Sequence, residues 1–210
     1  MEILSPAGHW EAMVAAVQSG ADAVYLGFGD YNARRGARNF SKEEFLAAVS
    51  YCHLRGVRVY VTVNTLLTDR ELPGAAEVLR TASQAGADAV IVQDWGVLRL
   101  ARAVAPDLPL HGSTQMTIHT LSGVEEGAKL GLRCAVLARE LSREEIALIC
   151  ERSPIAIEVF GHGALCMCYS GQCAMSALIG QRSGNRGTCA QPCRLPYQVD
   201  GGKTGHPLSL

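Results

Sequence analysis

The chain has 210 residues and 48% hydrophobic side chains, enough to bury one substantial core, and its composition gives no sign of a second domain. Its formal net charge of −1 argues against a protein that coats nucleic acid or a membrane surface through general charge. It has no run of roughly 18 apolar residues and no secretory signal pattern, so we expect a cytoplasmic protein without a membrane span.

Short apolar runs alternate with helix-like windows, which is the pattern of β–α units around a parallel sheet. In the first half we expect strands at residues 2–4, 23–26, 57–63 and 89–92, and helices at residues 9–18, 41–55 and 72–85. Ser5-Pro6 is expected to open the first helix, and the pattern Ser41-Lys42-Glu43-Glu44 is a capping box for the second.

The second half continues the alternation, with helices expected at residues 97–104, 121–130 and 142–150 and strands at 108–111, 134–137 and 155–160. The sequences SGADAVYLG and AGADAVIVQD repeat one helix end, turn and strand. These units predict an α/β fold, a TIM-like barrel in one domain over residues 1–210. A barrel needs eight strands, so we expect the N-terminal part of a longer protein with the eighth strand beyond Leu210. A seven-stranded or open doubly wound sheet is the alternative.

Polar side chains follow most of the predicted strands, at the end of a barrel where function is concentrated. They are Asn64, Gln93, Asp94, Gln115, Arg139, Glu140, Glu158 and His162. Each residue alone could satisfy loop backbone. Together they predict a polar pocket at the barrel mouth.

Residues 162–194 hold five of the eight cysteines, spaced Cys166-x6-Cys173-x15-Cys189-x3-Cys193 with Cys168 between the first two. Such clusters form disulfides, bind a metal or supply a reactive thiolate, and stable disulfides are rare in the cytoplasm. Thiolates on glycine-rich loops favour an iron–sulfur cluster, while zinc remains the alternative metal and a reactive thiol stays open.

The three cysteines outside this segment are Cys52, Cys134 and Cys150, which we expect to be small buried side chains. Basic and amide side chains surround the segment, and a second arginine-rich loop is expected at the same rim. Two basic loops on a near-neutral protein predict a local anionic ligand such as RNA, with solvated loops as the alternative. The candidate substrate-binding residues are Arg38, Gln115, Arg182, Asn185 and Arg186.

Several motifs along the chain resemble the peptidase U32 (collagenase-like) family. They are LSPAG at residues 4–8, SGADAVYLG at 19–27, NFSKEE at 39–44, VYVTVN at 59–64, HGALC at 162–166, YSGQC at 169–173 and RSGNRGTCAQPCRLPY at 182–197. The last motif is most similar to the subgroup that includes the protein required for 5-hydroxycytidine formation in bacterial large-subunit rRNA.

This resemblance implies a TIM-like barrel with a 4Fe–4S cluster, and oxygen-independent hydroxylation of RNA bases or ubiquinone precursors, with prephenate implicated for the RNA members. By position, Cys166, Cys173 and Cys189 match the family's cluster ligands. In several relatives the fourth ligand follows an LS-x-KDLC segment, and this chain ends at PLSL, so the fourth ligand is expected to be either Cys193 or a cysteine beyond Leu210. Cys168 departs from the family, which more often has Ser or Ala there.

The first hypothesis is an iron–sulfur enzyme that hydroxylates a pyrimidine in rRNA or tRNA, with a second U32-type protein or a further C-terminal domain as partner. Asn64, Asp94 and Glu158 would orient the base or the hydroxyl donor. The alternatives are a peptidase, with a cysteine nucleophile and His162, and a zinc-stapled, non-catalytic RNA-binding scaffold.

Overall fold

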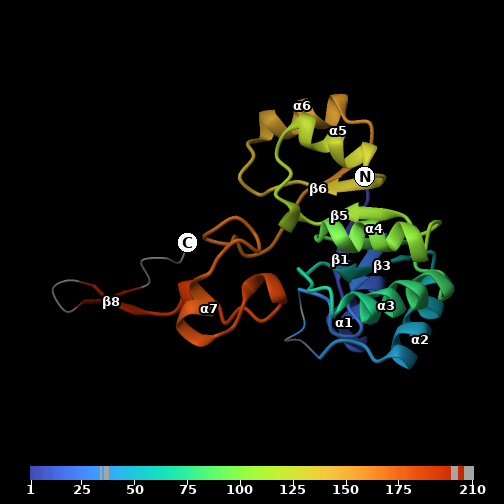
Figure 1. Cartoon of the computed structure of the whole chain (residues 1–210), viewed down its shortest axis with the longest axis horizontal. Helices are drawn as coiled ribbons and strands as arrows, with labels where there is room; N and C mark the ends of the chain where they lie inside the picture. Colours follow the sequence, from blue (N-terminus) through green and yellow to red (C-terminus); the bar gives the residue numbers. More distant parts are fainter. Residues whose placement is uncertain (34, 36–37, 200–202, 206–210) are drawn as a thin grey trace.

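A computed structural model describes residues 1–33, 35, 38–199 and 203–205. Seven strands form one parallel sheet, ordered as they occur in the chain: β1 (Leu4–Pro6), β2 (Ala23–Leu26), β3 (Arg58–Val63), β4 (Ala89–Val92), β5 (Leu110–Gly112), β6 (Leu132–Val136) and β7 (Ala156–Glu158). The sheet curls into a half-barrel (Figure 1). This arrangement confirms the predicted α/β, TIM-like fold with seven strands.

Helices connect the strands and cover the outer face of the sheet (Figure 1). They are α1 (Trp10–Gln18), α2 (Lys42–His53), α3 (Leu72–Gln84), α4 (Trp95–Val104), α5 (Leu121–Lys129) and α6 (Arg143–Arg152). Both predicted capping boxes are present, at Ser41 with Glu44 and at Ser142 with Glu145. Within the described residues, no helix is long and apolar enough to cross a membrane.

Alternating residues of the strands serve two cores, as β3 illustrates. Val59, Val61 and Val63 are fully buried in the larger core, which the helices share. Tyr60 faces the other way and packs with Ala23, Ala89 and Ile91 on the concave inner face. The inner face is therefore a distinct surface, and its polar residues are separated from the helices.

The expectation that Ser5-Pro6 opens the first helix is wrong. Both residues belong to β1, where Ser5 pairs with Val24 and Pro6 with Tyr25. Proline is tolerated there because β1 is an edge strand with β2 as its sole partner among the described strands. The helix begins at Trp10, capped by the His9 side chain.

Beyond β7 the chain leaves the sheet and carries α7 (Met175–Gly180), two 3-10 turns (Gly184–Arg186 and Pro192–Arg194) and an antiparallel hairpin, β8 (Tyr197–Val199) with β9 (Lys203–Gly205). The hairpin projects away from the half-barrel (Figure 1). It was not predicted, and the eighth barrel strand expected beyond Leu210 lies outside the described residues.

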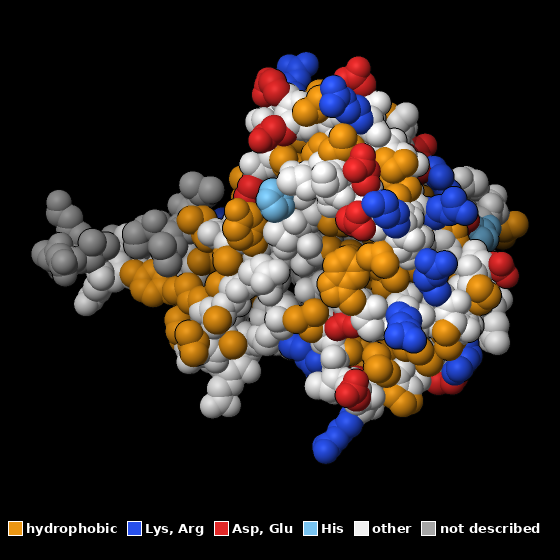
Figure 2. All heavy atoms as spheres, turned by 45° about the horizontal axis from the view of Figure 1, so that its top comes forward, with side chains coloured by type: hydrophobic (Ala, Val, Ile, Leu, Met, Phe, Trp, Pro, Cys, Tyr) orange, Lys and Arg blue, Asp and Glu red, His pale blue; other side chains and the backbone are white. Residues whose placement is uncertain are grey.

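Apolar side chains are gathered on this C-terminal part of the surface (Figure 2). The large exposed ones are Val159, Phe160, Leu165, Met167, Tyr169, Leu178, Ile179 and Leu195. Large apolar side chains gathered on a surface typically mark a region that another chain or domain covers.

Candidate functional site

The cysteine segment, residues 162–194, lies against the loops at the carboxyl ends of the strands. Gly187 adopts a φ of +74° against the loop after β2, and a Cβ atom there would lie 2.3 Å from the Asn32 carbonyl oxygen. Only glycine allows that approach, because the contact is with backbone. Next to it, the Leu66 amide donates to the Asn185 carbonyl at 3.4 Å.

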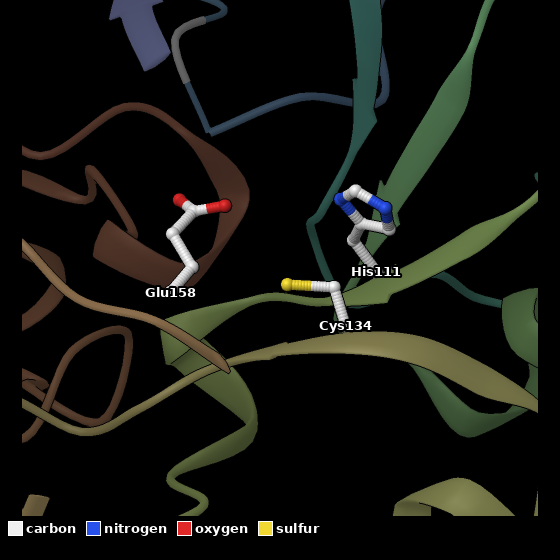
Figure 3. Close-up of side chains that lie close together, drawn as sticks. All are labelled: His111, Cys134 and Glu158. Carbon is white, nitrogen blue, oxygen red and sulfur yellow. The ribbon is translucent and has the colours of Figure 1, made fainter. Parts of the chain in front are cut away.

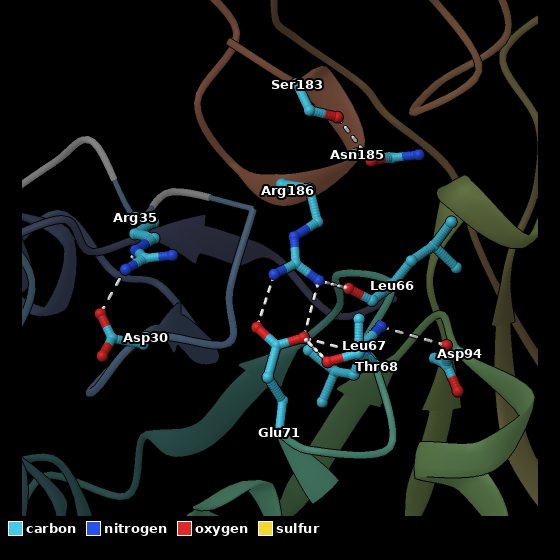
Figure 4. A network of polar contacts seen from close by, with 10 residues as sticks. All are labelled: Asp30, Arg35, Leu66, Leu67, Thr68, Glu71, Asp94, Ser183, Asn185 and Arg186. Atoms are coloured by element: carbon cyan, nitrogen blue, oxygen red, sulfur yellow. Dashed lines mark hydrogen bonds and ion pairs between the residues drawn. The ribbon is translucent and has the colours of Figure 1, made fainter. Parts of the chain in front are cut away.

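Arg186 attaches the same part of the segment to the barrel (Figure 4). Its Nη1 donates to the Leu66 carbonyl at 2.6 Å and to Glu71 Oε2 at 3.0 Å, and its Nη2 donates to Glu71 Oε1 at 2.5 Å. Hydrogen bonds from Arg186, and then from Thr68, lower the pKa of Glu71 to about 2. The guanidinium predicted to bind substrate is thus engaged with the protein's own carboxylate.

Loss of this ion pair is expected to lower the free energy needed to detach the cysteine segment from the barrel by about 1 kcal/mol. Because the pKa of Glu71 is lowered from 4.5 to about 2, the contribution is complete above pH 4.5 and is lost as the pH falls toward 2. Hydrogen exchange at segment amides should therefore be faster in Glu71→Gln than in the unsubstituted protein at neutral pH. The difference should vanish between pH 4.5 and 2.

The matched control is Glu77→Gln, which removes a carboxylate from the same helix α3 that pairs only locally with Arg80. That variant should exchange like the unsubstituted protein in the cysteine segment. Equal exchange in Glu71→Gln and Glu77→Gln at neutral pH would show that the ion pair does not hold the segment.

The segment also reaches the loops after β5 and β6. A Cβ atom on Gly171 would lie 3.2 Å from Gln115 Cδ, and Gln172 Nε2 donates to Thr117 Oγ1 at 3.4 Å. Arg139 Nη1 donates to the Ala164 carbonyl at 3.3 Å, and its Nη2 donates to Ser170 Oγ. These contacts place the cysteine segment over the barrel mouth, which the loops at the carboxyl ends of the strands form.

Three buried polar atoms at this mouth have no hydrogen-bond partner among the described residues: Gln93 Oε1, Gln115 Oε1 and Arg139 Nε. They follow the neighbouring strands β4, β5 and β6. Buried polar groups are nearly always satisfied in native proteins, so these atoms point to a polar ligand or ordered water at the mouth.

His162, a candidate catalytic residue, is exposed and lines a small cavity of about 260 Å³ together with Arg139 and Phe160. The Arg139 guanidinium carbon lies 5.8 Å from the centre of the Phe160 ring. The cavity therefore presents a cation, an aromatic face and an imidazole beside the cysteine segment.

Two other candidate catalytic residues hold backbone at the mouth. Asn64 Oδ1 accepts a hydrogen bond from the Ala33 amide at 2.9 Å. Asp94 caps α4 by accepting from the Gly96 amide at 2.7 Å, and its second oxygen accepts from the Leu67 amide at 3.3 Å. These contacts give both side chains a loop-positioning role in the structure.

The remaining candidate substrate-binding residues differ in solvent exposure and in their side-chain hydrogen bonds. Arg38 and Arg182 are exposed, and Arg182 uses its Nε to donate to the Thr188 carbonyl. Asn185 is half-buried, and its side-chain oxygen accepts from Ser183 Oγ at 2.7 Å. Arg38 and Arg182 are therefore the candidates with solvent-facing positive charge.

All eight cysteines are free thiols, and two of the predicted ligands share a backbone arrangement. The Met175 amide donates to Cys173 Sγ at 3.4 Å, and the Gln191 amide donates to Cys189 Sγ at 3.3 Å. Both cysteines flank Gly184, whose Cβ position would lie 3.8 Å from the Cys173 carbonyl oxygen and from Cys189 Cβ.

The other cysteines of the segment lie nearby. Burial, and then the neighbouring Cys173 and Cys166 thiols, raise the pKa of Cys168. Cys193 is half-buried in the 3-10 turn that packs against α7. The five cysteines of the segment span 28 residues, from Cys166 to Cys193 inclusive.

The thiols of the segment are the candidate donors for either predicted metal site, zinc or an iron–sulfur cluster. A tetrahedral zinc site with Zn–S bonds of about 2.3 Å needs sulfur atoms about 3.8 Å apart. No three sulfurs of the described cysteines lie within 4.8 Å of one another. A 4Fe–4S cluster binds each thiolate to a different iron and spreads the ligands more widely, and amide donors to sulfur tune such clusters. Among the described residues, the cysteines are not preformed as a tetrahedral zinc site with three sulfur ligands.

Glu158 does not join the mouth residues. It ends β7 with its side chain on the inner face, close to His111 and Cys134. Its carboxyl pKa is raised to about 7 by burial and by the charge of Glu2. Sequence reasoning missed His111, and treated Cys134 as a buried apolar residue only. The signal that could have found them is the alternation of polar residues on neighbouring strands.

Two of the three structural cysteine predictions are confirmed, because Cys52 and Cys134 are buried. The prediction for Cys150 is wrong, since this residue is exposed. Helix α6 buries Ile149 alone, so the position beside it faces solvent.

The model of the peptidase family U32 matches residues 8–207 of the chain. The chain belongs to peptidase family U32. The U32 fold assignment agrees with the solved structure of a U32 peptidase, which superposes with a TM-score of 0.64 at 18% identity over 76% of this chain and 68% of that one.

Two curated U32 relatives are named for RNA hydroxylation. A 23S rRNA 5-hydroxycytidine synthase of Escherichia coli K12 is 43% identical over 199 residues, which are 95% of this chain and 30% of the relative. The tRNA hydroxylation protein P1 of Bacillus subtilis 168 is 38% identical over 203 residues, which are 95% of this chain and 48% of the relative. The U32 chain described here thus spans 30% and 48% of the lengths of these two relatives.

Proposed function

We propose that this U32 chain is the barrel of an iron–sulfur enzyme that hydroxylates a pyrimidine in rRNA or tRNA without molecular oxygen. The observation that carries the proposal is the position of the cysteine segment. The segment lies over the barrel mouth, and the sulfurs of Cys173 and Cys189 each accept a hydrogen bond from a backbone amide. At the mouth, the buried atoms Gln115 Oε1 and Arg139 Nε have no hydrogen-bond partner among the described residues. The two relatives named for hydroxylation of rRNA and tRNA support the choice of substrate.

The proposed 4Fe–4S cluster would supply one-electron transfer, and Cys166, Cys173, Cys189 and Cys193 would hold it. The protein's own residues would position the reactants. Gln93, Gln115 and Arg139 would bind the polar edge of the base, because their free atoms are buried donors and acceptors.

The oxygen atom would come from an organic hydroxyl donor, for which we propose prephenate. The cavity beside Arg139 and His162 is the proposed place for this small carboxylate, because a guanidinium binds carboxylates through directed hydrogen bonds. Arg38 and Arg182 would contact RNA phosphates from the exposed rim. Arg186 and Asn185 would act indirectly, by holding the segment in place.

The exposed apolar side chains of the C-terminal part would be covered by a second U32-type protein or a further domain. The peptidase hypothesis remains the alternative because of the family's name. Within the described residues, however, His162 has no side-chain hydrogen bond to a cysteine, which a thiol–imidazole pair would provide.

The test is to express the protein in a bacterium whose own U32 hydroxylases have been deleted, and to digest its rRNA and tRNA to nucleosides. Mass spectrometry should find a pyrimidine nucleoside that has gained one oxygen atom, also under anaerobic growth. No oxygenated pyrimidine, together with peptide cleavage by the purified protein that a thiol alkylator abolishes, would establish the peptidase instead.

A further inference from the structure

The inner face of the half-barrel carries three metal-ligating side chains on adjacent strands, one each from β5, β6 and β7. His111 pairs directly with Cys134 in the register of β5 and β6. Cys134 pairs with Ala156, and Glu158 lies two residues further along the same face of β7. One nitrogen, one sulfur and one carboxylate oxygen all lie within 4.8 Å of one another. The three side chains converge on a common space (Figure 3).

The side chains of these residues make no hydrogen bond elsewhere in the part of the chain that the structure describes. His111 Nδ1 is buried without a hydrogen bond, and the His111 ring packs edge-on against Tyr60 at 4.8 Å between centres. The neighbouring polar groups satisfy one another, because the Tyr60 hydroxyl donates to Glu2 at 2.6 Å and Arg58 pairs with the same carboxylate. Within the described residues, the histidine, thiol and carboxylate side chains therefore have no hydrogen-bond partner, although the charges of Glu2 and Arg58 act on them.

The acid–base properties of the three groups bear on cation binding, and the Glu158 carboxyl, whose pKa is raised to about 7, is partly ionised at neutral pH. Burial lowers the pKa of His111 to about 4, so its imidazole is neutral and retains a lone pair at pH 7. Burial raises the pKa of Cys134 to about 12. A divalent ion would displace the thiol proton of Cys134, because it stabilises the thiolate and the carboxylate, and it would bind the neutral imidazole.

We propose that His111, Cys134 and Glu158 bind one divalent transition-metal ion of the zinc class, at a site distinct from the cysteine segment. Mixed nitrogen, sulfur and oxygen donors suit a borderline ion such as zinc, and calcium or magnesium would require oxygen ligands. Tetrahedral coordination would bring the ligand atoms to about 3.3–3.8 Å apart, a contraction of about 1 Å from the limit observed. Three protein ligands would leave a fourth position for water on the inner face.

The first test isolates this site from the cysteine segment by replacing Cys166, Cys168, Cys173, Cys189 and Cys193 with serine. Titration of that protein with Co²⁺ should give one equivalent of a tetrahedral complex with sulfur-to-cobalt charge-transfer absorption, and Zn²⁺ should displace it. A further Cys134→Ser substitution should abolish the charge-transfer band. The matched control is Cys52→Ser, which removes another buried thiol and should leave the band unchanged.

Glu158→Gln should keep the charge-transfer band, because the thiolate remains, and weaken Co²⁺ binding by about 10-fold or more. Absence of the band in folded protein, or a band that survives Cys134→Ser, would overturn the proposal and leave a metal-free polar cluster.

Should the five-serine protein fail to fold by circular dichroism, the same question is put to the anaerobically purified protein with all its cysteines. One zinc per chain that Cys134→Ser removes, with iron unchanged, would support the site. Zinc content equal in the two proteins would contradict it. Because iron is counted separately, failure of this site leaves the proposed iron–sulfur function standing, and the reverse also holds.

Discussion

Cys173→Ser is expected to remove bound iron and to lower RNA hydroxylation by about 100-fold or more. Serine provides no thiolate at neutral pH, and the Met175 amide that now donates to Cys173 Sγ would lose its sulfur acceptor. Cys189→Ser should behave in the same way, since the Gln191 amide donates to its sulfur. The measurements are iron per chain after anaerobic purification and the yield of oxygenated pyrimidine nucleoside.

The control is Cys150→Ser, which replaces an exposed thiol on α6 and should change neither quantity. Circular dichroism should show that the barrel is retained in all three variants, because Cys173 and Cys189 lie outside the sheet. Full hydroxylation by folded Cys173→Ser would remove the thiolates from the mechanism.

Gly187→Ala is expected to detach the cysteine segment from the barrel mouth. The added Cβ would stand 2.3 Å from the Asn32 carbonyl oxygen and 3.1 Å from the Ala33 backbone, and alanine at a φ of +74° is strained in addition. Collisions of this kind, with backbone on both sides, cost about 3 kcal/mol. A cost of that size lowers the ratio of molecules with the segment bound at the barrel mouth to molecules with it detached by about 100-fold. Hydroxylation should fall in proportion.

Hydrogen exchange provides a readout of Gly187→Ala that does not depend on activity. The Leu66 amide, which donates to the Asn185 carbonyl, should lose protection while the amides of β3 keep theirs. Gly180→Ala is the matched control within the segment, because a Cβ there meets nothing within 4 Å. If the two variants hydroxylate equally well, seating of the segment is not required for the reaction.

Much of the barrel could be predicted because its local signals agree with its packing. The strands are nearly continuous apolar runs, since helices cover one face and an inner core the other, and both capping boxes mark helix starts. The error at Ser5-Pro6 arose where a local helix-start pattern competed with pairing to β2, and the tertiary contact prevailed. Cys150 was predicted to be buried but is exposed, because Ile149 is the buried residue of α6.

The candidate site could be predicted in position more than in detail. The rule that barrel strands end at a functional mouth correctly placed Gln115 and Arg139 next to the cysteine segment. No local pattern reveals that Arg186 pairs with Glu71, 115 positions away in sequence. The position of a residue at a strand end also does not indicate whether its side chain faces the mouth or the inner surface. For this reason Glu158 was expected at the mouth, whereas it lies near His111 on the inner face.

Whether the cysteine segment holds an iron–sulfur cluster can be decided by chemical analysis of anaerobically purified protein. We expect about four iron and four acid-labile sulfide per chain, with both lost in Cys173→Ser and retained in Cys150→Ser. Zinc bound through the segment cysteines, with neither iron nor sulfide in the unsubstituted protein, would contradict this expectation.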